Sequence, residues 1–334
     1  LLHMLRVFFT GAFHPPRRFN WIVGLALFFA VLTSNFTGYL LPWDQLAFWA
    51  VTICTGMLEY IPWVGTTLQR LIRGGMEVGP ETLSHFFAIH VMIMPVCFFI
   101  LMPFHFWRVR KARGVVLPRS ENPGALSRES MVPVNPNLLI REVAVGLSLM
   151  AFVMVVSVFF DAPLGDPANL GLSPNPTKAP WYFAGFQELL VHFDPMFVIM
   201  VIPILLIGGA IAIPYLRYEQ DTSGIWFCSA AGRKRVLIAA AGALIATALA
   251  VIFDELIITD AAWLADMPGV WARGVIPVAL VLGLLTGLYI WMRRKMGISS
   301  NEAVQTFVTF LFAALVVLTG VCVWFRGPGM KLGF

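Results

Sequence analysis

Ionisable residues are scarce in this sequence. Asp, Glu, Lys and Arg make up 12% of its 334 residues, about half of the ~25% that is typical of soluble domains. Apolar residues account for 59%, and they come in blocks long enough to cross a bilayer. Together these features exclude a soluble enzyme and indicate a polytopic membrane protein.

Cysteine is also rare, and its spacing excludes two kinds of site. The sequence has no CxxC or CxxCH motif, and its cysteines are Cys54, Cys97, Cys228 and Cys322. It therefore contains neither a disulfide framework nor an attachment motif for a c-type haem. The first 13 residues lack the layout of a signal peptide. We interpret them as the end of a helix that begins upstream of Leu1.

Seven stretches lack Asp, Glu, Lys and Arg over a length that can cross roughly 30 Å of hydrocarbon. They are residues 19–41, 82–107, 143–160, 196–215, 236–253, 274–292 and 304–325. Only helices and closed barrels satisfy their backbone in lipid, and these runs are continuous rather than alternating. The sequence therefore predicts an all-α transmembrane bundle with seven full spans and a partial first helix.

Basic residues predict the topology. Most of the 23 lysines and arginines lie in the connections after the opening fragment and after the second, fourth and sixth spans. By the positive-inside rule that face is cytoplasmic. The net charge of +5 thus reflects topology and gives no sign of nucleic-acid binding. On the opposite face, residues 42–81 and 161–195 are rich in Trp, Pro and Gly, and we expect short surface helices there.

Two histidines share the second span, His90 and His105. Fifteen residues of α-helix correspond to a rise of roughly 22 Å and an angular offset of about 60°. Both rings can then face one side of the helix near opposite membrane surfaces, as two stacked haem irons with axial imidazoles require. The alternative is that both histidines are bonded to neighbouring helices.

The first full span repeats this spacing in glycine. Gly24 and Gly38 lie 14 residues apart, a rise of about 21 Å, and glycine lets a flat macrocycle approach a backbone closely. His3 lies level with His105, so the two can hold the haem nearer the cytoplasm. His90 then lacks a partner in this chain, and we expect that partner upstream of Leu1 or on another polypeptide.

Several motifs follow one another along the chain: Gly38-Tyr39-Leu40-Leu41-Pro42-Trp43-Asp44-Gln45, Thr82 to His90, His105 with Arg110-Lys111, Pro163-Leu164-Gly165-Asp166-Pro167-Ala168-Asn169 and Pro180-Trp181-Tyr182-Phe183. In this order they resemble the cytochrome b/b6 family of quinol-oxidising bc and b6f complexes. The resemblance covers roughly residues 1–253. It divides the chain into a b6-like haem-binding part (1–120), a part similar to subunit IV with the quinol-site loop (121–260), and extra helices (261–334).

The resemblance implies roles for individual residues. His90 resembles a ligand of the haem nearer the positive side, and His3 and His105 resemble the ligands of the other haem. Pro180, Trp181 and Tyr182 resemble the motif at the quinol-oxidising pocket. Arg110 and Lys111 match basic residues near the quinone-reducing side, where they can hold propionates or an anionic quinone.

One departure concerns the proton acceptor. Many family members read Pro-Glu-Trp-Tyr, whereas this chain reads Ala179-Pro180-Trp181-Tyr182. The nearest carboxylate able to replace that Glu is Glu188, six residues after Tyr182. A base in a quinol pocket must accept a proton and release it, so we expect Glu188 to be partly buried with a raised pKa. The alternative is a solvated or capping Glu.

A second departure is His85, at a position where the family usually has Arg near a propionate. His192 and Glu59 are weaker candidates for a proton exit route, and both also fit a place at the membrane interface.

The predicted function is that of the cytochrome b subunit of a quinol:cytochrome c type oxidoreductase. The resemblance implies two b haems, a quinone such as menaquinone, a Rieske-type iron-sulfur protein, a cytochrome c or other c-type subunit, lipids and a homodimer. It leaves open a separate chain supplying the first helices and an extra c-type haem attached upstream of Leu1. The location implied is a prokaryotic inner membrane, with the Pro-Trp-Tyr loop on the periplasmic side.

Two rival functions remain. A transporter whose histidines relay protons without haem predicts no visible absorption. A haem-bearing membrane anchor of a dehydrogenase passes electrons without bifurcating them, and it would co-purify with a molybdenum or flavin subunit rather than a Rieske-type protein.

Overall fold

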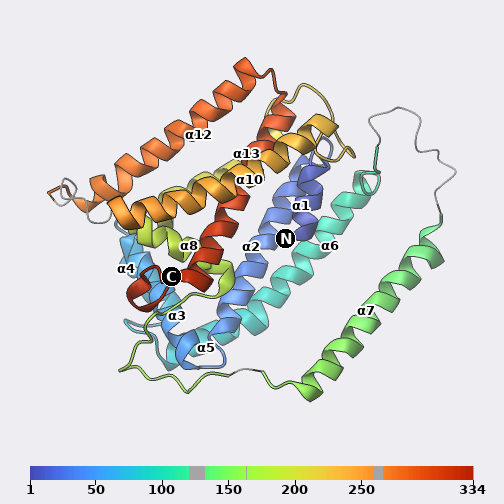
Figure 1. The fold of residues 1–334 in the computed structure, drawn as a ribbon. Coiled ribbons are helices and arrows are strands. Elements are labelled where there is room, and N and C mark those ends of the chain that lie inside the picture. The colour runs from blue at the N-terminus through green and yellow to red at the C-terminus, as the bar shows by residue number, and fades with distance from the viewer. Residues whose placement is uncertain (120–131, 163, 259–265, 334) are drawn as a thin grey trace.

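The computed structural model describes residues 1–119, 132–162, 164–258 and 266–333. These residues form helices and connections, and their β-structure is limited to two isolated bridges. Seven helical stretches are long and apolar enough to span a membrane: 18–39, 80–111, 134–159, 197–215, 230–258, 270–295 and 300–325. They confirm the predicted helical bundle with seven spans, and the short helix α1 (Leu2–Phe9) precedes them (Figure 1).

The spans are joined by shorter helices. In chain order the elements after α1 are α2 (Arg18–Tyr39), α3 (Gln45–Gly56), η1 (Met57–Tyr60), α4 (Gly65–Arg73), α5 (Pro80–Ala88), η2 (Ile89–Ile93), α6 (Met94–Lys111), α7 (Val134–Phe159), α8 (Trp181–His192), η4 (Phe197–Val201), α9 (Ile202–Ala212), η5 (Ile213–Tyr215), α10 (Ala230–Phe253), η6 (Asp254–Ile258), η7 (Val270–Val275), α12 (Ile276–Lys295), α13 (Ser300–Gly320), η8 (Val321–Phe325) and η9 (Pro328–Met330).

Three of the spans contain a π-helical turn directly before a proline. The turns η2, η4 and η7 are each followed by a helix with proline in its first two positions. Proline has no N–H for the carbonyl four residues earlier, and its ring crowds that carbonyl. The preceding turn therefore widens, and the span continues with one residue taken up in the wide turn.

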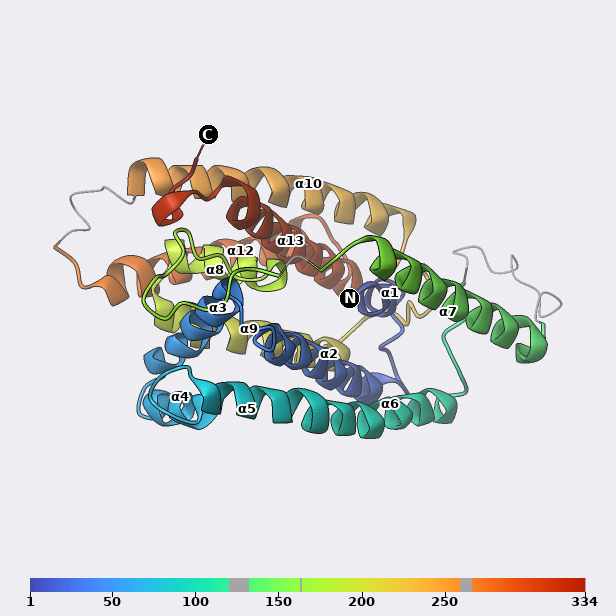
Figure 2. The same ribbon diagram turned by 90° about the horizontal axis from the view of Figure 1, so that it is seen from below.

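The helices pack in two groups that meet at α8. The helix α2 packs along α5, η2 and α6, while α10 packs along α13. Figure 2 shows α8 and α3 at one end of the bundle, between these two groups. The helix α7 lies at the edge, and its side chains are almost all exposed (Figure 1).

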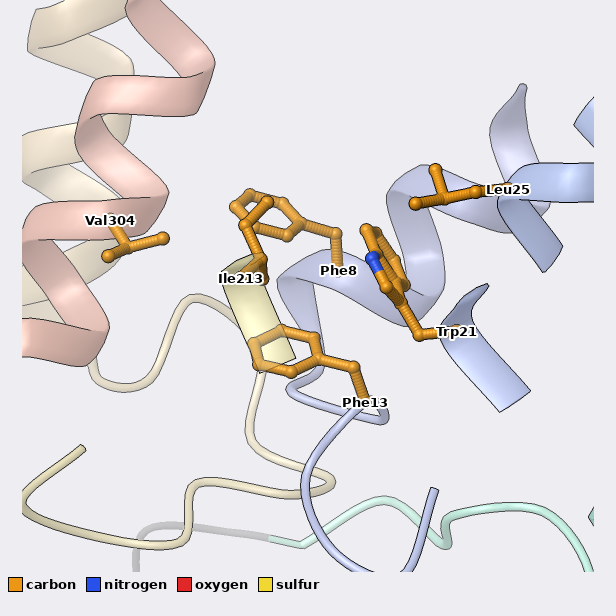
Figure 3. Packing of buried hydrophobic residues seen from close by; sticks show 6 residues of the cluster. All are labelled: Phe8, Phe13, Trp21, Leu25, Ile213 and Val304. Carbon is orange, nitrogen blue, oxygen red and sulfur yellow. The ribbon is translucent and has the colours of Figure 1, made fainter. Parts of the chain in front are cut away.

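A buried apolar cluster joins the start of the chain to its last span. Its members are Phe8, Phe13, Trp21, Leu25, Ile213 and Val304 (Figure 3). The indole Nε1 of Trp21 also donates to the carbonyl oxygen of Ala210 at 2.8 Å, which fixes α2 against α9. His14, which precedes Pro15 and Pro16, is buried, with its ring against Tyr218. The last span is thus packed into the same core as the first helices.

The loops expected to contain short helices do contain them. Asp44 caps α3 by accepting the N–H of Ala47 at 2.8 Å. The N–H of Gln45 donates to the carbonyl oxygen of Asp166 at 2.8 Å, so the connection after α7 docks on the start of α3. Buried Arg73 donates its Nε to Thr55 Oγ1 at 2.8 Å and fixes α4 against α3.

Parts of the sequence-based division fall outside the described residues. Both predicted domain boundaries, 120/121 and 260/261, and the motif residue Pro163 lie there. The three-part division therefore stays a prediction.

Candidate functional site

Two glycines of α2 face the two histidines of the neighbouring span. A Cβ placed on Gly24 would lie 3.6 Å from Cε1 of His105, and one placed on Gly38 would lie 2.6 Å from Cε1 of His90. The sequence predicted that glycine makes room for a macrocycle. In the structure, Gly38 first makes room for the imidazole of His90 itself.

The two histidines are 15 residues apart and the two glycines are 14 residues apart, yet each glycine lies beside one histidine. The π-helical turn η2 explains this difference. His90 lies in the wide turn η2, whereas α2 is α-helical throughout. If η2 takes up one residue, the 15 residues from His90 to His105 act as 14, an offset of about −40° at about 100° per residue. The straight-helix estimate of about 60° is therefore wrong for these two rings. The same −40° describes Gly24 and Gly38, so each glycine meets one histidine.

The hydrogen bonds of His90 fix its tautomer. Its Nδ1 lies 2.9 Å from the carbonyl oxygen of Ser34, and Thr37 Oγ1 lies 3.4 Å from the same nitrogen. A carbonyl only accepts, so Nδ1 carries the proton and Nε2 keeps its lone pair. Axial histidines of metal sites are held in this way by a partner on their other nitrogen.

His3 and His105 form a pair of facing rings. Their centroids are 6.4 Å apart, and the ring planes are at 84°. A metal–imidazole bond of about 2 Å and a ring centre about 1 Å behind the nitrogen would place two axial imidazoles of one iron about 6 Å apart. The observed spacing fits that arrangement. The Nδ1 of His105 is buried without a hydrogen-bond partner among the described residues.

The remaining histidines are engaged elsewhere. His14 contacts Tyr218 and Asn301, His85 lies against Gly74, and His192 bonds to Glu188 and Asp254. The second ligand expected opposite His90 stays a prediction about residues outside this chain.

Arg110 and Lys111 end α6 on the side of His105. Arg110 is exposed, and Nζ of Lys111 lies 5.1 Å from the ring centroid of Trp107. Two cations in the last turn favourably offset the helix dipole. Their predicted contact with propionates or quinone stays a prediction.

The Pro-Trp-Tyr segment begins α8. Pro180 precedes the helix, Trp181 is 70% exposed, and Phe183 packs on Phe36 of α2 at 5.9 Å between centroids. Burial raises the pKa of the Tyr182 phenol, and neighbouring Tyr39 and Cys54 add to the effect. Tyr182 thus lies toward α2 and α3.

A glutamine that the sequence did not single out fastens this segment. Gln187 Oε1 accepts the N–H of Ala179 at 2.6 Å, and its Nε2 donates to the carbonyl oxygen of Thr177 at 2.7 Å. One side-chain amide therefore satisfies backbone groups on both sides of Lys178 and holds the loop against α8.

Glu188 differs from its expected state. It was expected to be partly buried with a raised pKa, but it is fully buried. Burial alone would raise the pKa of Glu188, but hydrogen bonds from His192 and Arg326 and the charge of Arg326 hold it below its usual range. The expected rise in pKa was wrong because Arg326, which follows the last span, reaches α8 only through the packing of separate helices.

Glu188 and Tyr182 point to different neighbours. Six residues of helix correspond to an offset of about 120° and a rise of about 9 Å. Tyr182 lies toward α2 and α3, while Glu188 bonds to Arg326 beyond η8. The structure therefore does not bring these two predicted catalytic residues into direct contact. Glu59, the other weaker candidate for a proton exit route, lies in η1.

The fold and the paired histidines define a class: an all-helical membrane protein with imidazoles placed for axial ligation. The family model described as cytochrome b(N-terminal)/b6/petB matches residues 1–167. The chain belongs to this cytochrome b/b6 family, as its motifs indicated.

Individual relatives agree with this assignment. The chain is 47% identical over 113 residues to cytochrome b6 of Gracilaria tenuistipitata var. liui, covering 33% of this chain and 52% of the relative. It is 32% identical over 204 residues to cytochrome b of Cereibacter sphaeroides, covering 58% of this chain and 45% of the relative. The chain thus spans about half the length of the curated relatives it matches.

A solved structure shares the fold. The chain is similar to a hyperthermophilic respiratory Complex III with a TM-score of 0.57 and 22% identity, over 94% of this chain and 73% of that one. At this identity the likeness concerns the fold alone, and here it extends through the C-terminal helices that the family model leaves out.

Proposed function

We propose that this chain is the cytochrome b subunit of a quinol-oxidising, bc-type complex in a prokaryotic inner membrane. The facing rings of His3 and His105 carry the proposal, because their centroid spacing of 6.4 Å fits two imidazoles on one iron. The proton-relay transporter leaves this geometry, and the lone pair of His90 Nε2, without a purpose.

The chain's own residues hold two b haems and separate them. His3 and His105 hold the haem nearer the cytoplasm, and His90, with a ligand from outside this chain, holds the other. When bound, the haems supply one-electron transfer across the membrane. The protein fixes the ligand tautomer, keeps the ligands on one rigid pair of helices, and excludes water between them.

The quinol pocket is proposed at the start of α8, near Pro180, Trp181 and Tyr182. Pro180, Trp181 and Tyr182 would hold the quinol there, and a Rieske-type iron-sulfur protein and a haem held by His90 would supply its two one-electron acceptors, with its protons leaving on the positive side. A cytochrome c or other c-type subunit accepts electrons from the iron-sulfur protein. Gln187 supports this role because it holds the loop rigidly at the backbone.

The quinone-reducing site is proposed near Arg110 and Lys111, which end α6 beside His105. The missing Pro-Glu pair favours a low-potential quinone such as menaquinone. Association as a homodimer, a separate chain for the first helices and an added c-type haem remain part of the proposal.

The test is optical and uses the complex purified from its native membrane. Dithionite should give a reduced b-haem spectrum with two components. Menaquinol should also reduce these haems, and quinone analogues that compete for the quinol pocket should partly inhibit that reduction. A complex with no Soret band after dithionite would refute the proposal. A Soret band with a co-purifying molybdenum or flavin subunit and no Rieske-type protein would instead favour the dehydrogenase anchor.

A further inference from the structure

Five ionisable side chains from three parts of the chain meet at the end of the bundle that carries the quinol loop. They are Glu188 and His192 of α8, Asp254 and Glu255 of η6, and Arg326 after η8. All five lie outside the residues that the cytochrome b/b6 family model matches.

His192 has a carboxylate on each ring nitrogen. Nδ1 lies 2.7 Å from Asp254 Oδ2, and Nε2 lies 3.1 Å from Glu188 Oε1. An ionised carboxylate can only accept, so both contacts are hydrogen bonds when the imidazole carries two protons. Either the ring is an imidazolium between two carboxylates, or one of the carboxyls holds the second proton. The three groups share one mobile proton in both cases.

Exposure rises along this row of groups. The side chain of Glu188 is 0% exposed, that of His192 is 8% exposed, and that of Asp254 is 20% exposed. The inner end of the row lies on α8, and the outer end lies in η6, directly after α10. A row of hydrogen-bonded titratable groups with this gradient has the form of a proton path.

Arg326 holds the inner carboxylate. Its Nε lies 3.0 Å from both oxygens of Glu188, and its Nη2 lies 2.6 Å from Oε1. Its Nη1 reaches Glu255 at 2.7 Å and the carbonyl oxygen of Met330 at 2.8 Å. With His192 protonated, two cations face three carboxylates, so the cluster keeps a net negative charge that attracts protons.

Other charged groups flank the cluster. Arg273 donates Nη1 to the carbonyl oxygen of Val191 at 2.8 Å, and its own carbonyl accepts the N–H of Asp194. Lys178 donates Nζ to the carbonyl oxygen of Val323 at 2.9 Å. Asp194 caps the N–H of Met196 at 3.0 Å. Among the hydrogen bonds described here, His192 has only carboxylates and Arg326 as side-chain partners.

We propose that Glu188, His192 and Asp254 form a proton relay that carries a quinol proton outward, with Arg326 as the positioning residue of its inner end. This inference rests on the proposed quinol oxidation. Burial lowers the pKa of His192, but hydrogen bonds and charges from Asp254 and Glu188 outweigh burial and raise it. Since the pKa of Glu188 is held low, the proton resides on the imidazole.

The transfer step balances as follows. When a quinol O–H bond breaks, its electrons pass to the iron-sulfur protein and the haem, and its proton passes to Glu188. Glu188 lies about 9 Å along α8 from Tyr182, so the first transfer needs a bridging water, as general base catalysis permits. His192 then releases its Nδ1 proton to Asp254, which gives it to water, and the ring is left neutral with its remaining proton on Nε2. A half-turn of the ring brings the unprotonated Nδ1 toward Glu188, which passes its proton to that nitrogen, and the imidazolium between two carboxylates is restored.

The first test needs no quinol. Infrared difference spectra of the purified complex between neutral and alkaline pH should show loss of an imidazolium band in the wild type. That band should be missing in His192→Gln and should titrate at lower pH in Asp254→Asn. A wild-type difference spectrum that His192→Gln leaves unchanged would overturn the shared proton, whatever the complex does with quinol.

The second test is kinetic. Asp254→Asn keeps an oxygen acceptor for Nδ1 but cannot take the proton, so kcat for quinol oxidation should fall at least tenfold with KM and the b-haem spectrum unchanged. Asp254→Glu should recover most of the rate. Glu77→Gln, a change at an exposed carboxylate of another loop, should leave kcat unchanged. Wild-type kcat and pH profile in Asp254→Asn would refute the relay.

The two failures are separable. If quinol does not reduce the wild-type haems, the proposed function fails, and the infrared test still decides whether the three groups share a proton. If quinol reduces them and Asp254→Asn turns over normally, the proposed function stands and the relay fails. Arg326→Lys should lower kcat less than Arg326→Gln, because a lysine can still pair with Glu188.

Discussion

The guanidinium of Arg326 and the carboxylate of Glu188 form a fully buried ion pair across 138 residues of sequence, with Nη2 2.6 Å from Oε1. This ion pair connects the segment after the last span to the helix α8. Removing one partner of such a pair leaves an uncompensated buried charge.

Arg326→Leu should therefore destabilise the protein by about 3–5 kcal/mol, and the double variant Glu188→Leu/Arg326→Leu should regain most of that loss. Thermal unfolding in detergent, followed by helix content, measures both. The exposed pair of Arg119 and Asp221, 3.8 Å apart, gives the control, since breaking the ion pair there with Asp221→Asn should cost about 1 kcal/mol or less. Equal losses in the single and double variants would contradict the pairing.

The stability contributed by this cluster should depend on pH in two directions. The pKa of His192 is raised in the fold, so its contribution is fully present below its ordinary value of about 6.5 and is lost as pH rises through the higher folded pKa. The pKa of Glu188 is lowered, so its contribution is present above about 4.5 and is lost as pH falls through the folded pKa.

Melting temperature should thus decline on the alkaline side in the wild type and stay flatter there in His192→Gln. Scans from about pH 5 to about pH 9 cover the range in which histidine ordinarily titrates. An alkaline decline of the same size in both proteins would show that His192 is not its source.

The three candidate haem ligands should fall into two groups. His3→Ala and His105→Ala should each remove the same b haem, about half of the total, because their rings face each other at 6.4 Å. His90→Ala should remove the other. Pyridine haemochrome content and reduced-minus-oxidised spectra distinguish them, with Cys97→Ala on the same helix as the control. If His3→Ala and His105→Ala lost haems with different spectra, the two histidines would not ligate the same haem.

The two glycines of α2 should tolerate alanine differently. At Gly38 the new Cβ would lie 2.6 Å from His90, whereas at Gly24 it would lie 3.6 Å from His105, an ordinary contact. Gly38→Ala should cost about 1–3 kcal/mol and disturb the spectrum of the His90 haem, while Gly24→Ala should do so less. Equal damage at both positions would mean that a macrocycle, rather than an imidazole, sets the available space.

Substituting Gln187 should change the position of the loop at Thr177 and Ala179, which it binds, and should leave the haem spectra unchanged. Gln187→Leu removes two hydrogen bonds and leaves the N–H of Ala179 unpaired, a loss of about 1–3 kcal/mol in the ordered loop. KM for quinol should rise several-fold while the haem spectra stay those of the wild type. An unchanged KM would show that the loop is held by its aromatic contacts, and Phe183 on Phe36 is then the next contact to vary.

Much of the fold could be predicted because a membrane simplifies the problem. Every span must be helical and apolar over a fixed length, so seven charge-free runs predicted seven helices. The sequence showed that the spacing of Gly24 and Gly38 nearly equals that of His90 and His105, but it did not show which glycine contacts which histidine. The wide turn at His90 was missed, although Pro95 in the following turn was its signal.

The carboxylate cluster could not be predicted in the same way. Asp254, Glu255 and Arg326 were visible as charges at the ends of spans, but their partners depend on how α10 and α13 pack against α8. The state of Glu188 was wrong for the same reason: a pKa follows from burial and from charges that lie far away in sequence.

The sequence by itself thus determined the helical class and the family, and it singled out the histidines proposed to hold haem, because hydropathy, spacing and motif order are local properties of the chain. Tertiary structure alone decided that Gly38 makes room for an imidazole, that the ring planes of His3 and His105 lie at 84° to each other, and that Arg326 pairs with Glu188. These relations depend on distances between separate helices, and those distances are set by packing.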